Sequence, residues 1–263
     1  MLNHTKWVLA ALFLTIGLNA QADSTVVFAD AGGGQSKASG KVEISNGRIR
    51  SSSPGDGSAY MIFDAGANHF TMIDVDRKTY MVFDQEQIQE LVSMQKRAME
   101  QMEATLANMP AAQREQMRKM MSGMMGGGQP QAKAEPHRYV RNGKTETVAG
   151  YDCEVLEVFV GQKRIAEQCV VGQKQLGIPA DDYNTMKAMQ EFIVELVSQF
   201  PVVDEQIMEY GEPGRDEIPV RYSHYSKMTG TTSGELRSIN LETIDASRFE
   251  IPKGYKQQKM PKM

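Results

Sequence analysis

The chain has 263 residues, a formal net charge of −4 at pH 7 and only two cysteines. A mildly acidic protein without a basic cluster is a poor match for nucleic acid, so we expect no nucleic-acid partner. The length suffices for one sizeable core, and a single domain is the simpler expectation because sheet-rich domains often reach this size.

The amino-terminal segment has the features of a secretory signal peptide. Lys6 is followed by an apolar run from Trp7 to Leu18, too short to span a bilayer, and then by Asn19-Ala-Gln-Ala22. This ending predicts that residues 1–22 are removed by cleavage after Ala22, and that 23–263 are exported to the periplasm as a single domain. No later run approaches the ~18 apolar residues of a membrane helix, so we expect no membrane span in the mature chain.

The clearest local structure is centred on Asn46-Gly47, the favoured residue pair for a two-residue type I′ hairpin turn. Pairing across this turn sets Ile44 opposite Ile49. The next pair outward, Glu43 and Arg50, carries opposite charges. One face of the hairpin is then apolar and the other holds an ion pair, as a half-buried antiparallel ribbon requires.

Short segments rich in aromatic and β-branched residues surround this hairpin. Further strands are expected at 25–28, 59–63, 69–75 and 79–83. Because turn signals separate them at close spacing, they predict an amino-terminal meander of about six strands.

Helical periodicity replaces this pattern from Gln85 onward, where apolar residues recur at helical spacing and charged residues occupy much of the rest. Pro110 is expected to end or kink the helix, after which a second can form. We therefore predict a methionine-rich helical insertion at 85–125. Residues 126–136, rich in Gly, Gln, Ala and Pro, predict a flexible linker.

Strands resume after the linker, and a second amphipathic helix opens at Asp181-Asp182 and stops at Pro201. The later strands are expected at 137–141, 145–148, 151–171, 218–227 and 234–244. Asn142-Gly143 predicts a further hairpin turn. The order of strands, helix, strands, helix and strands predicts an α+β fold with helices on one face of an antiparallel sheet.

The two cysteines, Cys153 and Cys169, lie on opposite arms of a predicted hairpin with its midpoint at Gly161. Simple hairpin register puts them nearly opposite each other. Such a pair in an exported protein is expected to form a structural disulfide. Catalytic thiols are the weaker interpretation, since there is no C-x-x-C motif and no obvious nearby histidine.

Nine of the 19 methionines fall between Met94 and Met125. Methionine can fill core gaps, form an adaptable apolar surface or bind soft metal ions through sulfur. The predicted apolar ligand-binding residues are Met94, Met99, Met102, Leu106, Met109, Met117, Met120, Met121, Met124 and Met125. The last five also have the helical spacing that would present thioethers to Cu(I), so a copper site at Met117–Met125 stays open as an alternative. A surface for an envelope protein partner is the third possibility.

Signals for an enzyme are weak. His69, His137 and His224 each lie in a predicted strand, and none belongs to a paired metal-ligand motif. The sequence has no nucleophile elbow and no phosphate-binding loop. We therefore expect a protein without catalytic residues, a resident metal or a cofactor.

Three motifs, in order, resemble those of a known family: Lys78-Thr-Tyr-Met-Val-Phe-Asp84, Val148-Ala-Gly-Tyr-Asp-Cys153 and Asp245-Ala-Ser-Arg-Phe-Glu-Ile-Pro-Lys-Gly-Tyr255. With the signal segment and the methionine-rich helix, they look like an uncharacterised exported bacterial domain-of-unknown-function family. That family is similar in architecture to the periplasmic lipoprotein carriers and their outer-membrane receptors. The chain departs from the family's pattern in the unusually high methionine content of this helical insertion and in the long glycine-rich linker that follows it.

The resemblance implies a strongly curved antiparallel sheet, a half-barrel, whose concave face is covered by helices and can accept acyl chains. It carries over no catalytic residues. The function expected from the sequence is therefore non-enzymatic binding of a lipid, acyl chain or other apolar ligand in the periplasm.

Overall fold

The computed structural model describes a large part of the chain: residues 23–31, 38–52, 57–110, 113–114, 116, 136–198, 212–226 and 230–258. Three predicted features fall elsewhere. The signal peptide at 1–22, the Met117–Met125 cluster and residues 126–135 of the predicted linker lie outside the described residues.

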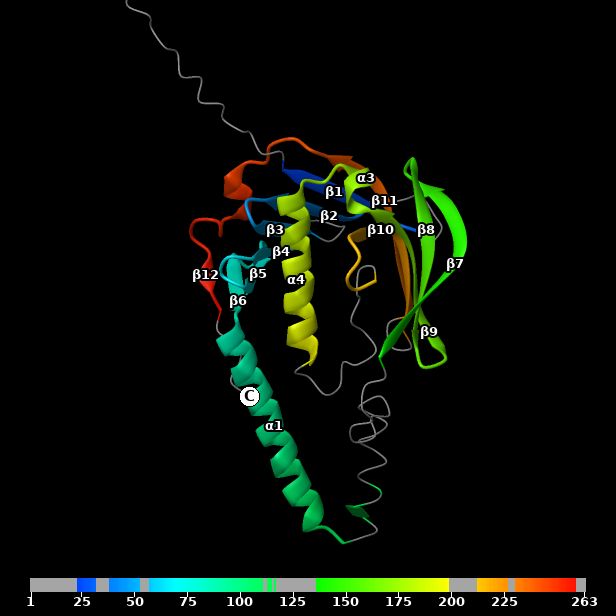
Figure 1. Cartoon of the computed structure of the whole chain (residues 1–263). Coiled ribbons are helices and arrows are strands. Elements are labelled where there is room, and N and C mark those ends of the chain that lie inside the picture. The colour runs from blue at the N-terminus through cyan, green and yellow to red at the C-terminus, as the bar shows by residue number, and fades with distance from the viewer. Residues whose placement is uncertain are drawn as a thin grey trace, which may run out of the picture.

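The described residues form twelve strands and several helices (Figure 1). The strands are β1 (Ser24–Asp30), β2 (Ala38–Ser45), β3 (Arg48–Ser52), β4 (Ala59–Asp64), β5 (His69–Asp74), β6 (Thr79–Phe83), β7 (His137–Val148), β8 (Tyr151–Val160), β9 (Lys163–Gly172), β10 (Glu217–Ser226), β11 (Gly230–Asn240) and β12 (Lys256–Gln257). The helices are α1 (Gln85–Ala107), α3 (Gln173–Leu176), α4 (Ala180–Ser198) and the 3-10 helix η1 (Ala246–Phe249).

All twelve strands belong to one open sheet, in the order β12-β6-β5-β4-β3-β2-β1-β11-β10-β9-β8-β7. Every pairing is antiparallel except that of β12 with β6. β1 joins the two halves of the sheet because it pairs with β2 on one side and β11 on the other. The sheet is strongly curved, and in Figure 1 β6 and β8 stand on either side of α4. The predicted α+β class and curved antiparallel sheet are confirmed.

The Asn46-Gly47 hairpin forms as predicted. Both turn residues have positive φ, 50° and 74°, as a type I′ turn requires. Ile44 pairs with Ile49, and Glu43 pairs with Arg50. The two isoleucines are 0% and 1% exposed, so the predicted apolar face is buried in the core.

The expectation of a hairpin turn at Asn142-Gly143 is wrong. The residues on both sides of it belong to the single strand β7: Arg141 pairs with Leu156 of β8 and Thr145 pairs with Glu154. The three residues between Arg141 and Thr145 form a bulge, and the positive φ of Gly143, 76°, is accommodated there. A glycine with this conformation suits a bulge as well as a turn, so the dipeptide alone does not separate the two.

Helix α4 packs against the amino-terminal half of the sheet. Its Phe192 ring lies 5.9 Å from that of Phe63 and 5.2 Å from that of Phe70, measured between ring centroids. Ile44 and Ile49 belong to the same buried cluster. The predicted apolar side of this helix is therefore the side that meets the sheet.

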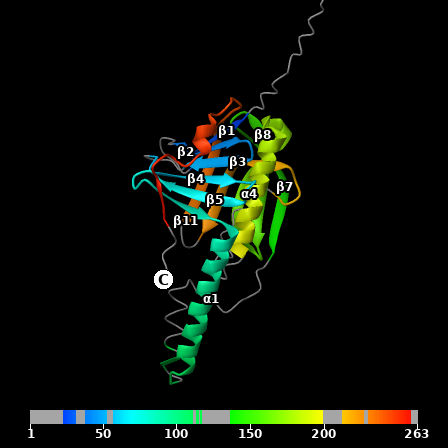
Figure 2. The ribbon, with the colours of Figure 1, turned by 90° about the vertical axis from the view of Figure 1, so that its left-hand side faces the viewer.

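Helix α1 begins directly after β6, where Asp84 Oδ1 accepts a hydrogen bond of 2.8 Å from the backbone N–H of Gln87. Ile88 packs into the same cluster as Phe192. Beyond this first part, both views show α1 extending away from the sheet (Figures 1 and 2). Among the helices that the structure describes, none combines the length and apolar character needed to cross a bilayer.

Candidate apolar ligand site

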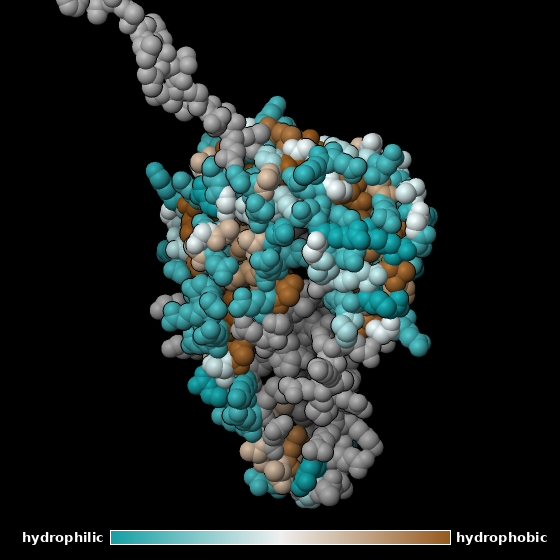
Figure 3. All heavy atoms as spheres, in the orientation of Figure 1, coloured by the Kyte–Doolittle hydropathy of each residue, from teal (hydrophilic) through white to brown (hydrophobic). Residues whose placement is uncertain are grey.

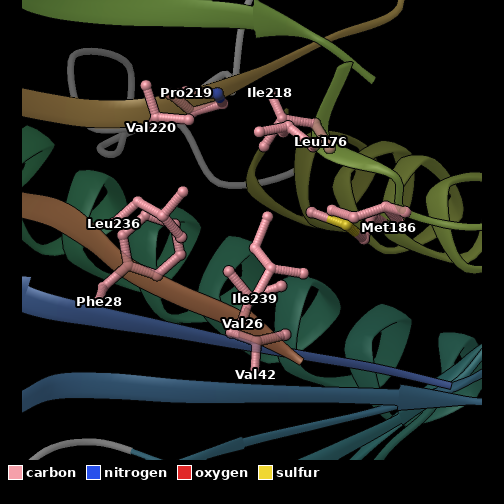
Figure 4. A pocket seen from close by; sticks show the side chains of 11 residues that line it. Val26, Phe28, Val42, Leu176, Met186, Ile218, Pro219, Val220, Leu236 and Ile239 are labelled. Atoms are coloured by element: carbon pink, nitrogen blue, oxygen red, sulfur yellow. The ribbon is translucent and has the colours of Figure 1, made fainter. Parts of the chain in front are cut away.

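A cavity of about 30 Å³ lies between the middle of the sheet and the segment that carries α3 and α4. The side chains that surround it come from both halves of the chain and point into a common space (Figure 4). They are Val26, Phe28, Val42, Leu176, Ile178, Met186, Ile218, Pro219, Val220, Leu236 and Ile239. Every one of these side chains is apolar, so the cavity offers no polar group to a ligand.

Strand alternation places most of the sheet residues of this lining. Val26 and Phe28 are two positions apart on β1 and therefore face the same side. On β10, however, three consecutive residues, 218–220, reach the cavity. A register shift between Pro219 and Arg221 explains this departure, because a bulge lets neighbouring residues turn toward one face. Proline fits this position since it lacks the N–H that a regular ladder needs.

The α3–α4 connection forms the other side of the cavity. Gly177 ends α3 with φ 71°, the left-handed conformation that glycine adopts readily. The chain reversal there sets Leu176 and Ile178, 4% and 2% exposed, on the cavity. Met186, half-buried on α4, completes this side.

The disulfide between Cys153 and Cys169 lies in the same buried cluster as much of the lining. Its sulfur atoms are 2.07 Å apart, and the predicted pairing is confirmed. The register differs from the expected one, because Cys169 pairs with Val155 rather than with Cys153. Two one-residue differences add up to this displacement: the turn is centred after Gly161, because Val160 pairs with Lys163, and the register shifts again between Val158 and Phe159. The disulfide therefore links diagonal neighbours on one face.

The predicted methionine site lies elsewhere in the structure. On α1, Met94 and Met102 are half-buried and Leu106 is buried, and α1 also carries Met99; Met109, just after the helix, is half-buried. Met94, Met102, Leu106 and Met109 do not line the cavity described above. Met117, Met120, Met121, Met124 and Met125 lie outside the described residues, so the copper alternative stays a prediction.

The cavity is small for a ligand site. Its volume is space for about two water molecules, whereas pockets that bury drug-sized ligands have about 300–1,000 Å³. An acyl chain would therefore fit into this space only if part of the surrounding structure moved. α4 stands between the two limbs of the curved sheet (Figure 1), so we expect α4 to be the element that would move.

Hydrophilic residues cover most of the described surface on the side shown in Figure 3, and hydrophobic ones are exposed in small separate areas. Among the residues that the structure describes, the exposed large hydrophobic side chains are Met72, Leu241 and Ile251. On this side, the described surface therefore shows no large continuous apolar patch.

The fold and cavity define an α+β protein with an open curved sheet and an apolar interior. Residues 126–255 match the model of a family described as a domain of unknown function (DUF4412). The expected relationship to an uncharacterised domain family is confirmed. A search of curated proteins found no match.

The family match covers β7 to β11, α4 and the disulfide, and it ends at Tyr255. It includes eight of the residues that line the cavity, whereas Val26, Phe28 and Val42 precede it. Strand β1, which carries two of these three, is inserted between β2 and β11. The cavity therefore needs both the matched region and the preceding strands.

Proposed function

We propose that this protein is a non-enzymatic periplasmic binding protein with a lipoprotein-carrier-like half-barrel, which takes up an acyl chain or another apolar ligand against the concave face of its sheet. The observation that carries the proposal is the lining of the cavity, in which all eleven side chains are apolar. Such a lining suits a hydrocarbon ligand and offers no nucleophile, acid or base.

In this proposal α4 is the cover of the half-barrel. It occupies the concave side with Phe192 and Met186, side chains that a ligand would replace on the sheet. Half-buried Met189, Ile193 and Leu196 extend the same side of the helix. Because the ligand and α4 compete for one apolar face, binding is favourable when the ligand buries at least as much apolar surface as α4 gives up.

The proposal is tested with purified mature protein and a fluorescent fatty acid. Met186→Gln keeps the size of the side chain but places an amide in the apolar site, which we expect to weaken binding about tenfold. Met186→Leu keeps the site apolar and should bind as the wild type does. Met72→Gln makes the same chemical change at a side chain that is 50% exposed on β5, and it should have no effect.

Two results would overturn the proposal. One is a wild-type protein that carries no lipid by mass spectrometry after gentle purification and takes up no fluorescent fatty acid. The other is an affinity that Met186→Gln and Met72→Gln change equally, because binding would then occur away from the cavity.

A further inference from the structure

The start of β1 is buried where three parts of the fold meet. Asp23 and Ser24 are 5% and 0% exposed. The backbone N–H of Ile244, which follows β11, donates a hydrogen bond of 2.7 Å to Asp23 Oδ2. Asp182, in the first turn of α4, is the third participant and is 3% exposed. The first residues of the expected mature chain therefore lie inside the fold.

Asp182 is buried with one carboxylate oxygen unpaired, although Ser24 interacts with its carboxyl group. Among the described residues, neither its Oδ2 nor Ser24 Oγ has a hydrogen-bond partner. Burial raises the pKa of Asp182 to about 6; the polar groups of Ser24 oppose this shift, and the negative charges of Asp23 and Asp181 add to it. A buried carboxylate surrounded by acidic neighbours is costly unless a cation pairs with it.

We propose that the α-amino group created at Asp23 by removal of residues 1–22 is the cationic partner of the Asp182 carboxylate. Ser24 lies against this carboxyl group, and Asp23 is the residue directly before it, with consecutive Cα atoms ~3.8 Å apart. The inference rests on the expected cleavage after Ala22 and is independent of the proposed ligand.

Cleavage changes the chemistry at this nitrogen. Before it, the Asp23 nitrogen is an uncharged amide with one hydrogen. Hydrolysis breaks the bond between Ala22 and Asp23; water supplies a hydroxyl to the new Ala22 carboxyl group and a hydrogen to the new amine. At neutral pH that carboxyl group loses its proton and the amine takes one up. The resulting ammonium has three donors and a positive charge, so it can satisfy Asp182 Oδ2.

The pair would tie the first turn of α4 to the start of β1. The pair would add an ionic contact at the end of α4 nearest β1, beside the apolar packing of Tyr183 in the same turn and of Phe192 farther along the helix. Removal of the signal peptide would thus complete the fold as well as release the chain.

The experiment uses the exported protein purified from the periplasm, with mass spectrometry to establish its first residue. Its α-amino group is acetylated with a limiting amine reagent, and the labelling rate is measured against pH. We expect the pKa of this amine to lie about one unit above the ordinary value of ~7.7–8.0, because a carboxylate stabilises its charged form. Labelling near neutral pH should therefore be about tenfold slower than after unfolding in urea.

Asp182→Asn should abolish this protection, whereas Asp181→Asn, a neighbouring change in the same turn, should preserve it. An ordinary α-amino pKa in the folded wild type, or equal labelling rates in the wild type and Asp182→Asn, would overturn the proposal. The wild-type titration decides the matter even if Asp182→Asn fails to fold. A first residue other than Asp23 would refute the cleavage site itself, and fatty-acid binding would be unaffected by that result.

Discussion

Arg248 donates hydrogen bonds of 2.7 Å to both carboxylate oxygens of Glu43, although the two residues are 205 positions apart. Glu43 is 2% exposed and also pairs with Arg50 and Lys41, at 2.7 and 2.8 Å. The contact fastens η1, near the carboxyl end of the chain, to the face of β2 that points away from the core. One buried carboxylate thus holds three cations from three parts of the fold.

Glu43→Gln should destabilise the protein by about 3 kcal/mol, because the three cations lose the charge that compensates them. Urea unfolding of the oxidised protein measures the change. Glu235→Gln is the matched control, since Glu235 pairs with Arg237 on the surface at 3.4 Å and such pairs contribute about 0.5 kcal/mol. Equal losses in the two variants would show that the Glu43 cluster contributes no more than a surface ion pair.

The same carboxylate predicts a pH dependence of stability. Burial alone would raise the pKa of Glu43, but hydrogen bonds from Arg248, Lys41 and Arg50 outweigh it and lower the pKa from 4.5 to about 2. The stabilisation is therefore complete above pH 4.5 and is lost as the pH falls toward 2. Unfolding free energies measured across this window should fall less steeply in Glu43→Gln than in the wild type, and an unchanged slope would contradict the assignment.

Part of this architecture could be predicted from the local sequence. The pairings of Ile44 with Ile49 and of Glu43 with Arg50 follow from one turn, because the type I′ geometry of Asn46-Gly47 fixes the register of both arms. The third partner of Glu43, Arg248, could not be predicted in this way. No periodicity links residues so far apart; only the complete sheet brings them together.

The candidate site shows the same division. The apolar side of the second amphipathic helix was predictable from its spacing, and Met186 on that side does line the cavity. The strand residues opposite Met186 were not predictable. Alternation shows which side of its own strand Val26 or Leu236 faces, but it does not show that β1 and β11 are neighbours in the sheet. The abundance of methionine predicted a site between Met94 and Met125 instead, but the number of methionines in a segment does not determine where their side chains lie in the fold.

The predicted register of the hairpin that carries the disulfide was wrong for a related reason. The turn is centred between Gly161 and Gln162 rather than at Gly161, because Val160 pairs with Lys163, and the shift between Val158 and Phe159 adds a further residue to one arm. No turn signal marks such a bulge in the sequence.

Loosening α4 should raise ligand uptake. Phe192→Leu removes ring contacts with Phe63 and Phe70 and should cost about 1–2 kcal/mol of stability. If α4 must leave the sheet for a ligand to bind, the same change lowers the cost of that movement and increases fatty-acid affinity by up to about tenfold. Titration with the fluorescent fatty acid measures it.

Phe249→Leu is the control for this variant. Phe249 is 4% exposed in η1, where Arg48 lies over its ring, and it has no part in α4 packing. It should lose stability without gaining affinity. A rise in affinity for both variants would mean that general destabilisation, rather than release of α4, exposes the apolar face.

Removing the disulfide should destabilise the chain by about 3 kcal/mol, the value expected for a link across 16 residues. Replacing Cys153 and Cys169 together with alanine avoids leaving a lone thiol in the core. Urea unfolding of the wild type with and without reductant, beside the double variant, measures the effect. Reductant should shift the wild type alone; a shift in the double variant as well would place its action elsewhere.

Gly234 and Tyr222 should show strong energetic coupling. They pair directly between β11 and β10, and a Cβ built on Gly234 would lie 2.6 Å from atoms of the Tyr222 side chain. Gly234→Ala therefore forces the ring to move and should cost about 1–3 kcal/mol. In a Tyr222→Ala background the obstacle is absent, and alanine is the better strand residue, so the same change should cost little or stabilise.

A double-mutant cycle from urea unfolding gives this coupling directly. The Tyr222 ring also lies 6.1 Å from that of Phe28, which lines the cavity. Gly234→Ala should thus alter fatty-acid binding through the displaced ring, and Tyr222→Ala should remove that additional effect. Additive free energies in the cycle would show that the ring moves aside without cost.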